Sequence, residues 1–167
     1  MVHDLVDAEI DIDALDDPDW RRGLETFARS YRQAFVTHPH VLTRVARRLL
    51  LASNALRVYD RLAAALTRAG VPARDTMRVM AEVDYIVLGS AIDNFIAGFS
   101  TDPAEYREDF PHLADVLRHV DRDTVNDTAF EAALRLQLDA LAALIGRSAP
   151  TGTSRRAAPA SRAPSRR

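Results

Sequence analysis

Apolar residues recur three and four positions apart along most of the chain, whereas alternation with a period of two, bounded by turn residues, is nearly absent. Side chains three and four positions apart lie on one face of an α-helix, so this spacing predicts amphipathic helices rather than strands. We therefore expect an all-α fold, with helices over residues 17–36, 39–50, 53–70, 73–99, 111–120 and 124–145.

Residues typical of helix ends stand at several of these boundaries. Asp17 can cap the first helix and Ser53 the third, because their side-chain oxygens accept hydrogen bonds from free backbone N–H groups. Gly70 can supply the left-handed residue that follows a helix, and Pro72 cannot continue one. Gly146 is expected to end the last helix in the same way.

The helices expected over 73–99 and 124–145 carry apolar side chains around most of their circumference. Such a helix needs cover on two sides, which the surface of a monomer does not provide. We therefore predict a homodimer in which these two helices of each subunit form a four-helix bundle; a larger monomeric bundle that buries both faces internally is the alternative. The residues expected at the dimer interface are Val87, Ala91, Phe95, Phe130, Leu134 and Leu141.

Charge divides the chain into three parts. Residues 1–16 form an acidic lead-in without lysine or arginine, residues 17–146 form the helical domain, and residues 147–167 form a basic tail rich in serine, proline, alanine and arginine. The acidic lead-in would repel phosphate groups, so nucleic acid is not expected to bind there. The composition of the tail is typical of a disordered, solubilising end; sequence-independent contact with nucleic-acid phosphates is the alternative.

Composition excludes several classes of function. The chain has no cysteine, and therefore no disulfide, thiolate metal site or cysteine nucleophile. Its mean hydropathy of -0.17 and its lack of a long uncharged apolar run argue against a membrane span, and no secretory signal opens it, so a cytoplasmic location is expected. The residue patterns of P-loops, nucleophile elbows, zinc proteases and dinucleotide-binding turns are missing, and we expect neither an enzyme nor a cofactor.

One cluster of potential metal ligands stands out. His112, Asp115 and His119 are spaced three and four apart, so they share one face of the helix expected there, and imidazole with carboxylate suits zinc or iron. The opposite face of that helix is apolar, which turns the three side chains towards water. We therefore predict a solvated surface and no metal; a small metal-binding bundle or helical enzyme is the alternative.

Several short segments occur together in the order and spacing of a known family. They are Trp20, Tyr31-Arg32-Gln33-Ala34-Phe35, His38-Pro39, the helix ending Leu62…Leu66…Gly70-Val71, Leu88-Gly89-Ser90-Ala91, and Phe130-Glu131-Ala132-Ala133-Leu134. Over residues 15–146 the chain resembles the C-terminal domain of TetR-family transcriptional regulators.

The resemblance implies a homodimeric regulator, most often a repressor, whose C-terminal domain binds a small molecule. Binding of that effector changes the spacing of two helix-turn-helix heads on their operator. Three helices of such a head would precede residue 17, and only the acidic lead-in does, so DNA contact is expected only through a head that this chain does not contain. The alternative is a headless dimerisation module that antagonises full-length relatives by forming mixed dimers.

The resemblance also places an effector pocket between the first three helices of the domain, closed by the fourth. Tetracycline is not expected, because polar drug and magnesium contacts of the family align with Phe27, Val45 and Leu62. We expect a hydrophobic or aromatic effector, oriented by a few polar groups among which Asn94 is a further candidate; for most of these residues a plain core role is the alternative. The expected ligand-binding residues are Phe27, Tyr31, Phe35, Val45, Tyr59, Leu62, Leu66, Met80, Asp84, Leu88 and Ile92.

Overall fold

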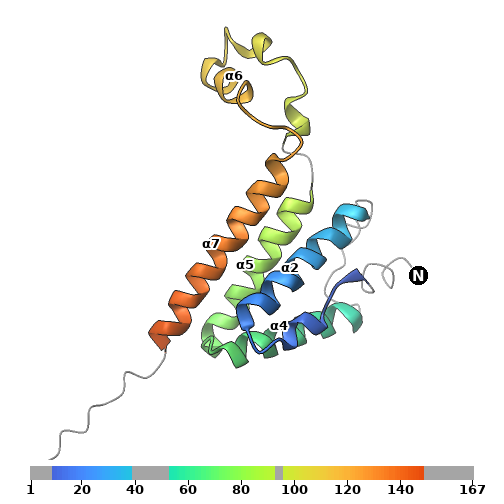
Figure 1. The fold of residues 1–167 in the computed structure, drawn as a ribbon, viewed down its shortest axis with the longest axis vertical. Coiled ribbons are helices and arrows are strands. Elements are labelled where there is room, and N and C mark those ends of the chain that lie inside the picture. The colour runs from blue at the N-terminus through green and yellow to red at the C-terminus, as the bar shows by residue number, and fades with distance from the viewer. Residues whose placement is uncertain (1–8, 39–52, 93–95, 149–167) are drawn as a thin grey trace, which may run out of the picture.

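The computed structural model describes residues 9–38, 53–92 and 96–148, and every regular element in these ranges is a helix (Figure 1). The prediction of an all-α fold is confirmed. None of the helices described has the length and apolar character needed to cross a membrane. In chain order the α-helices and 3₁₀ helices (η) are η1 (Asp13–Asp16), α2 (Trp20–Thr37), α4 (Ser53–Ala69), α5 (Ala73–Ala91), η2 (Ala97–Phe99), η3 (Pro103–Tyr106), α6 (Pro111–Leu117) and α7 (Val125–Ser148).

Several predicted helix ends differ from the structure, and the helix expected over 111–120 ends at Leu117. The cap of α2 is Asp19, whose side chain accepts hydrogen bonds from the backbone N–H groups of Arg21 and Arg22. Asp17 instead accepts from the Asp19 backbone N–H at 2.8 Å. Helix α5 ends at Ala91 rather than at residue 99, because Ile92 leaves the helical region with φ −79° and ψ 84°. Helix α7 continues through Gly146, since Gly70 is the only described glycine with positive φ. The helix expected over 39–50 lies outside the described residues.

The end of α4 follows the sequence expectation closely. Gly70 has a φ of 96°, and its N–H donates to the Thr67 carbonyl at 3.0 Å. The Val71 N–H donates to the Leu66 carbonyl, also at 3.0 Å. Both bonds together form a Schellman motif, and the buried side chains of Leu66 and Val71 supply the hydrophobic contact that accompanies it. This turn fixes the direction in which α5 leaves α4.

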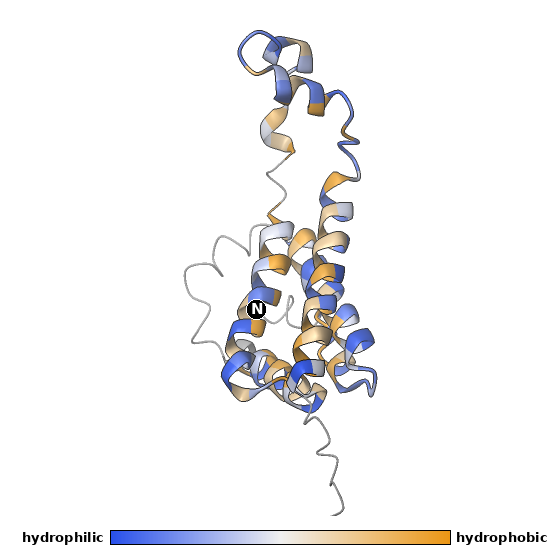
Figure 2. Cartoon of the chain, turned by 90° about the vertical axis from the view of Figure 1, so that its left-hand side faces the viewer, coloured by the Kyte–Doolittle hydropathy of each residue, from blue (hydrophilic) through white to orange (hydrophobic). Residues whose placement is uncertain are grey.

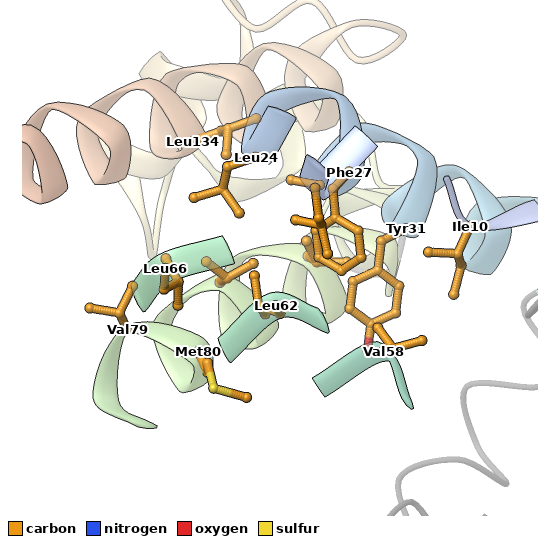
Figure 3. Packing of buried hydrophobic residues seen from close by; sticks show 14 of the residues in the cluster. Ile10, Leu24, Phe27, Tyr31, Val58, Leu62, Leu66, Val79, Met80 and Leu134 are labelled. Atoms are coloured by element: carbon orange, nitrogen blue, oxygen red, sulfur yellow. The ribbon is translucent and has the colours of Figure 1, made fainter. Parts of the chain in front are cut away.

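Four helices form the body of the molecule. Helices α2, α5 and α7 lie side by side, and α4 packs across α2 and α5 near one end (Figure 1). Their inward faces form one hydrophobic core, which includes the whole apolar stripe of α2 (Figure 3). The side chains that are most completely buried are Phe27, Leu66, Val79, Val83, Val87, Leu138 and Leu141.

A row of ion pairs joins α2 to α7. Residue numbers rise along α2 while those of their partners fall along α7, so the two helices are antiparallel. Each pair is exposed on at least one side and contributes about 0–1 kcal/mol, so the row aligns the helices more than it stabilises them. The pairs, with their nitrogen-to-oxygen distances, are Arg21–Asp139 (2.6 Å), Arg29–Glu131 (2.8 Å) and Arg32–Asp127 (2.7 Å).

The described part of the acidic lead-in packs against the body. Ile10 and Leu15 are buried in the core, although the helical domain is expected to begin only at residue 17. The Asp11 N–H donates to Ser30 Oγ at 2.9 Å, and a Cβ added to Gly23 would lie 2.5 Å from the Ala14 carbonyl oxygen. The segment therefore runs antiparallel along α2, and it needs a glycine on α2 at the point of closest approach.

The acidic side chains of this segment bind arginines of α4. Asp16 contacts Arg61 at 2.5 Å and Arg68 at 3.1 Å, and Arg68 also donates to the Leu15 carbonyl at 2.8 Å. These bonds explain why so acidic a stretch can lie on the domain surface: its charge is partly neutralised by the helix that it covers.

Residues 96–124, here called the arm, project beyond the ends of α5 and α7 (Figures 1 and 2). Within the arm, η3 packs on α6, and Ala114 and Leu117 are buried. Phe110 and Val116 are exposed. The arm therefore has a small cluster of its own and leaves two large apolar side chains uncovered in the single chain.

Candidate functional site

An aromatic column runs along the inner face of α2. Phe27, Tyr31 and Phe35 are all buried, and successive ring centroids are 5.5 and 5.4 Å apart in tilted arrangements (Figure 3). The column follows from the spacing of four residues, which places side chains one above the other on a helix. It gives the core a wall of aromatic rings that pack on one another in tilted arrangements.

The middle ring of this column, Tyr31, belongs to a polar cluster in which two tyrosines hold one carboxylate. The Tyr31 hydroxyl donates to Asp84 Oδ1 at 2.9 Å, and the Tyr59 hydroxyl donates to Asp84 Oδ2 at 3.1 Å. The three residues come from α2, α4 and α5, so one carboxylate links all three helices. Charge-assisted hydrogen bonds of this kind are among the stronger ones in proteins.

Burial dominates the electrostatics of this cluster. Desolvation raises the pKa of the Asp84 carboxyl above its ordinary value, and the two tyrosine hydrogen bonds offset only part of that effect. Burial and the nearby carboxylate raise the pKa of Tyr59 to about 12, and they raise the pKa of Tyr31 as well. The hydroxyls therefore stay protonated and act as donors at neutral pH.

The residues expected to bind ligand fall into distinct environments. Tyr59, Asp84 and Leu88 are half-buried, and Ile92 is exposed. Val45 and the further polar candidate Asn94 lie outside the described residues. The remaining residues are buried in one continuous core cluster: Phe27, Tyr31, Phe35, Leu62, Leu66 and Met80.

Two exposed apolar residues lie on the same helix faces as the polar cluster, and sequence reasoning did not select them. Leu56 is 53% exposed and stands three residues before Tyr59, whereas Met77 is 74% exposed and stands seven residues before Asp84. Both spacings keep side chains on one helix face. The same-face spacing was the signal available in the sequence. These residues add exposed apolar surface to the two helices that carry Tyr59 and Asp84.

The described residues expected at the dimer interface lie in the core of the single chain. The five described residues of that set, Val87, Ala91, Phe130, Leu134 and Leu141, are buried between helices of one subunit, and Phe95 lies outside the described residues. The surface that α5 and α7 leave open carries Leu136 and Tyr85 instead, both exposed. A helix that is apolar on most sides allows either assignment, because periodicity does not say which face meets its own subunit.

A shallow groove crosses this open surface. It encloses about 310 Å³, and small residues of α7 face α5 across it. A Cβ added to Gly89 would meet nothing within 4 Å, so the α5 side of the groove is open as well. The lining residues are Ile86, Gly89, Ser90, Ile92, Val125, Asn126, Ala129, Phe130 and Ala133.

A second cavity, of about 360 Å³, lies between the acidic segment, α2 and α4. Trp20 and Leu24 line its apolar side, and Asp16 and Asp17 line its polar side. Both carboxylates already hold arginines, Asp16 with two from α4 and Asp17 with Arg22 at 2.7 Å. Of the expected ligand-binding residues only Leu66 reaches this cavity, which is separate from the aromatic column.

The potential metal ligands of the arm have other partners. Asp115 pairs with Arg118, which lowers the pKa of its carboxyl, and the His119 ring nitrogen Nδ1 lies 2.8 Å from the Asp115 carbonyl oxygen. Among the described residues no three histidine or acidic side chains come together as metal ligands would.

Comparison with known proteins agrees with this architecture. The chain is similar to the crystal structure of apo ActR from Streptomyces coelicolor, with a TM-score of 0.64 and 20% identity over 87% of this chain and 73% of that one. It is also similar to a possible TetR family transcriptional regulator from Streptomyces coelicolor A3(2), with a TM-score of 0.65 and 28% identity over 86% of this chain and 77% of that one. No curated protein sequence matches it.

The sequence model of one family covers most of the helical domain. It is described as the tetracyclin repressor-like, C-terminal domain, and it matches residues 14–145. The match begins within the packed acidic segment and ends near the end of α7, so it includes the aromatic column, the Asp84 cluster and the arm. With its fold shared by a TetR-type relative, the chain belongs to the family of tetracyclin repressor-like C-terminal domains.

Proposed function

We propose that this chain is the effector-binding and dimerisation domain of a TetR-type transcriptional repressor that senses a hydrophobic or aromatic small molecule. The observation that carries the proposal is the aromatic column of α2, whose middle ring, Tyr31, shares the Asp84 carboxylate with Tyr59. An apolar site with a few convergent polar groups is the usual composition of a small-molecule pocket. The function is regulatory and not catalytic.

In this proposal the effector binds where α2, α4 and α5 meet. Asp84 is bonded to both other helices, so a ligand that engages this carboxylate changes the contacts of all three at once. Such a ligand shifts the domain between two arrangements only as far as it binds one of them more tightly than the other. A coupling of about 1–3 kcal/mol is typical of allosteric proteins.

The second part of the proposal is a homodimer formed through the open surface of α5 and α7. Leu136 is 70% exposed, and it lies on α7 among Ala129, Ala132 and Ala140, which leave room for another helix to approach closely. Pairing two copies of this surface gives a two-fold four-helix bundle. DNA contact is assigned to the helix-turn-helix head of the parent regulator and not to any helix of this chain.

Fluorescence titration with N-phenyl-1-naphthylamine tests the ligand site. We expect saturable, blue-shifted emission, because this neutral aromatic probe gains quantum yield when it leaves water. Tyr59→Ala removes half-buried aromatic surface at the site and should weaken binding at least tenfold. Phe110→Ala, in the arm, is the matched control and should bind normally. Emission that never saturates, or that both variants leave unchanged, rejects the site.

A further inference from the structure

We propose that the Asp84 carboxylate selects effectors that carry a cationic amine on an aromatic or apolar body. The inference rests on the proposed function and narrows it, because it names the charge of the ligand at the same site. Three observations support it. The described hydrogen bonds to Asp84 leave acceptor capacity, its described partners are uncharged hydroxyl groups, and apolar side chains lie on the same helices.

The hydrogen bonds from the described residues fill only part of the acceptor capacity of Asp84. An ionised carboxylate accepts about four hydrogen bonds, two at each oxygen. The described residues supply two, one from Tyr31 to Oδ1 and one from Tyr59 to Oδ2. A protonated amine has donors only, so it can bind the remaining acceptor positions without displacing either tyrosine.

Neither of these partners neutralises the charge. Both are hydroxyl groups, and within the described part of the chain no arginine or histidine lies within ion-pair distance of Asp84. A carboxylate in apolar surroundings is costly unless it is paired with a cation. The raised pKa of this carboxyl reflects the same cost. Elsewhere in the body the carboxylates at helix contacts are paired with arginine, as at Asp16 and Glu131.

The surroundings of Asp84 also suit the rest of such a ligand. The Tyr31 and Tyr59 hydroxyls hold the carboxylate, so aromatic side chains surround the position where an amine would bind. Along the same faces of α4 and α5, Leu56 and Met77 present exposed apolar surface. Methionine adapts its shape to differently shaped partners. The amine would thus meet the carboxylate while its apolar body lies against these side chains.

Isothermal titration with three naphthalene probes of equal size tests the charge preference. The probes are 1-naphthylmethylamine, which is cationic at neutral pH, the neutral 1-naphthylmethanol and the anionic 1-naphthoate. We expect the amine to bind about ten- to a hundredfold more tightly than the alcohol, the range of a hydrogen bond to a charged group. The anion should bind most weakly, because it would lie against a carboxylate.

Two substitutions separate the carboxylate from general effects of charge. Asp84→Asn keeps the shape and one acceptor and should reduce the amine preference to less than threefold. Asp60→Asn removes a carboxylate from the exposed face of α4 and should leave the preference intact. Circular dichroism confirms that each variant is folded.

The outcomes distinguish the two proposals. If the chain binds N-phenyl-1-naphthylamine but binds the three smaller probes equally, or does not bind the amine, selection by Asp84 is rejected and the apolar site stands. If Asp84→Asn and Asp60→Asn reduce the amine preference alike, the preference is a surface-charge effect and the inference is also rejected. If none of the four probes binds, the proposed function fails with it.

Discussion

The body and the arm are built from the same kind of sequence, yet only the body closes a large core. Both contain amphipathic helical segments, but α2, α5 and α7 each have 18 or more residues, whereas α6 has seven. Long helices offer several turns of apolar surface to each other, and a short one offers a single turn. The arm buries Ala114 and Leu117 and leaves Phe110 and Val116 to the solvent. Helix length, and not apolar content alone, thus decides which part holds the domain together.

The largest difference should appear when one buried side chain is truncated in each region. Phe27→Ala leaves a cavity in the hydrophobic core of the body, and it should lower the free energy of unfolding by about 3–5 kcal/mol. Leu117→Ala truncates the small cluster of the arm and should leave the global transition almost unchanged. Urea unfolding followed by circular dichroism measures both. Equal losses would mean that the arm is part of the cooperative core.

Charged substitutions on exposed leucine and valine test which surface pairs two subunits. In the proposed dimer, Leu136→Glu brings one glutamate from each subunit into the interface. Repulsion between the two charges should convert the dimer to a monomer at micromolar concentration. Val116→Glu, on an arm residue that is 64% exposed, should leave the dimer intact. Size-exclusion chromatography with light scattering reads the mass. A dimer that survives the first change and not the second would place the interface on the arm.

A glycine in each region separates close packing from open space. Gly23→Ala would bring a methyl group 2.5 Å from the Ala14 carbonyl oxygen, so it should cost about 1–3 kcal/mol and loosen the acidic segment. Gly98→Ala in the arm meets nothing within 4 Å and should be nearly neutral. Hydrogen exchange at residues 11–17, which should accelerate in the first variant alone, tests this. Unchanged exchange there would show that α2 absorbs the methyl group by a small shift.

One aspartate in each region should respond to pH with opposite sign. The folded-state pKa of Asp84 is raised, so its ionisation costs stability as pH rises through that pKa. Asp84→Asn removes this cost and should raise the melting temperature by a few degrees at pH 7. Below the unfolded pKa of about 3.8 the variant should give no gain. The pKa of Asp115 is lowered, so its contribution is present above its unfolded pKa and is lost on acidification. Thermal melts of both asparagine variants from pH 3 to 8 decide this. A gain from Asp84→Asn that persists at pH 3 would exclude ionisation as its cause.

The smallest effect is expected from the exposed ion pairs of the body. Glu131→Gln removes the carboxylate to which Arg29 donates two hydrogen bonds, each with a nitrogen-to-oxygen distance of 2.8 Å. Exposed pairs are screened by solvent, so the loss should be about 0.5–1 kcal/mol and should shrink in 1 M salt. Denaturant midpoints at low and high salt measure it. A loss that is independent of salt would point to packing of the Glu131 stem.

Periodicity predicted the helices of the body, because four long segments repeat their apolar residues every three or four positions. The sequence also selected Tyr31, Tyr59 and Asp84 as polar candidates, but not the bonds between them, since these join residues up to 53 positions apart. The sequence did not predict which face of α7 packs against its own subunit. Leu134 and Leu136 look alike in sequence, yet one is buried against α5 and the other faces solvent. Only the packing of neighbouring helices decides between such residues.

The ion pairs between α2 and α7 have a further consequence through Arg135. It lies one turn from both Glu131 and Asp139, and its charge already acts on Glu131. If α7 slid by one turn, about 5.4 Å, in one direction, Arg29 would face Arg135; a slide in the other direction would set Arg21 against it. Either misalignment exchanges an attraction for a repulsion between two guanidinium groups. The pairing of these two helices is thus protected from slippage in both directions by a residue that takes no part in the pairing itself.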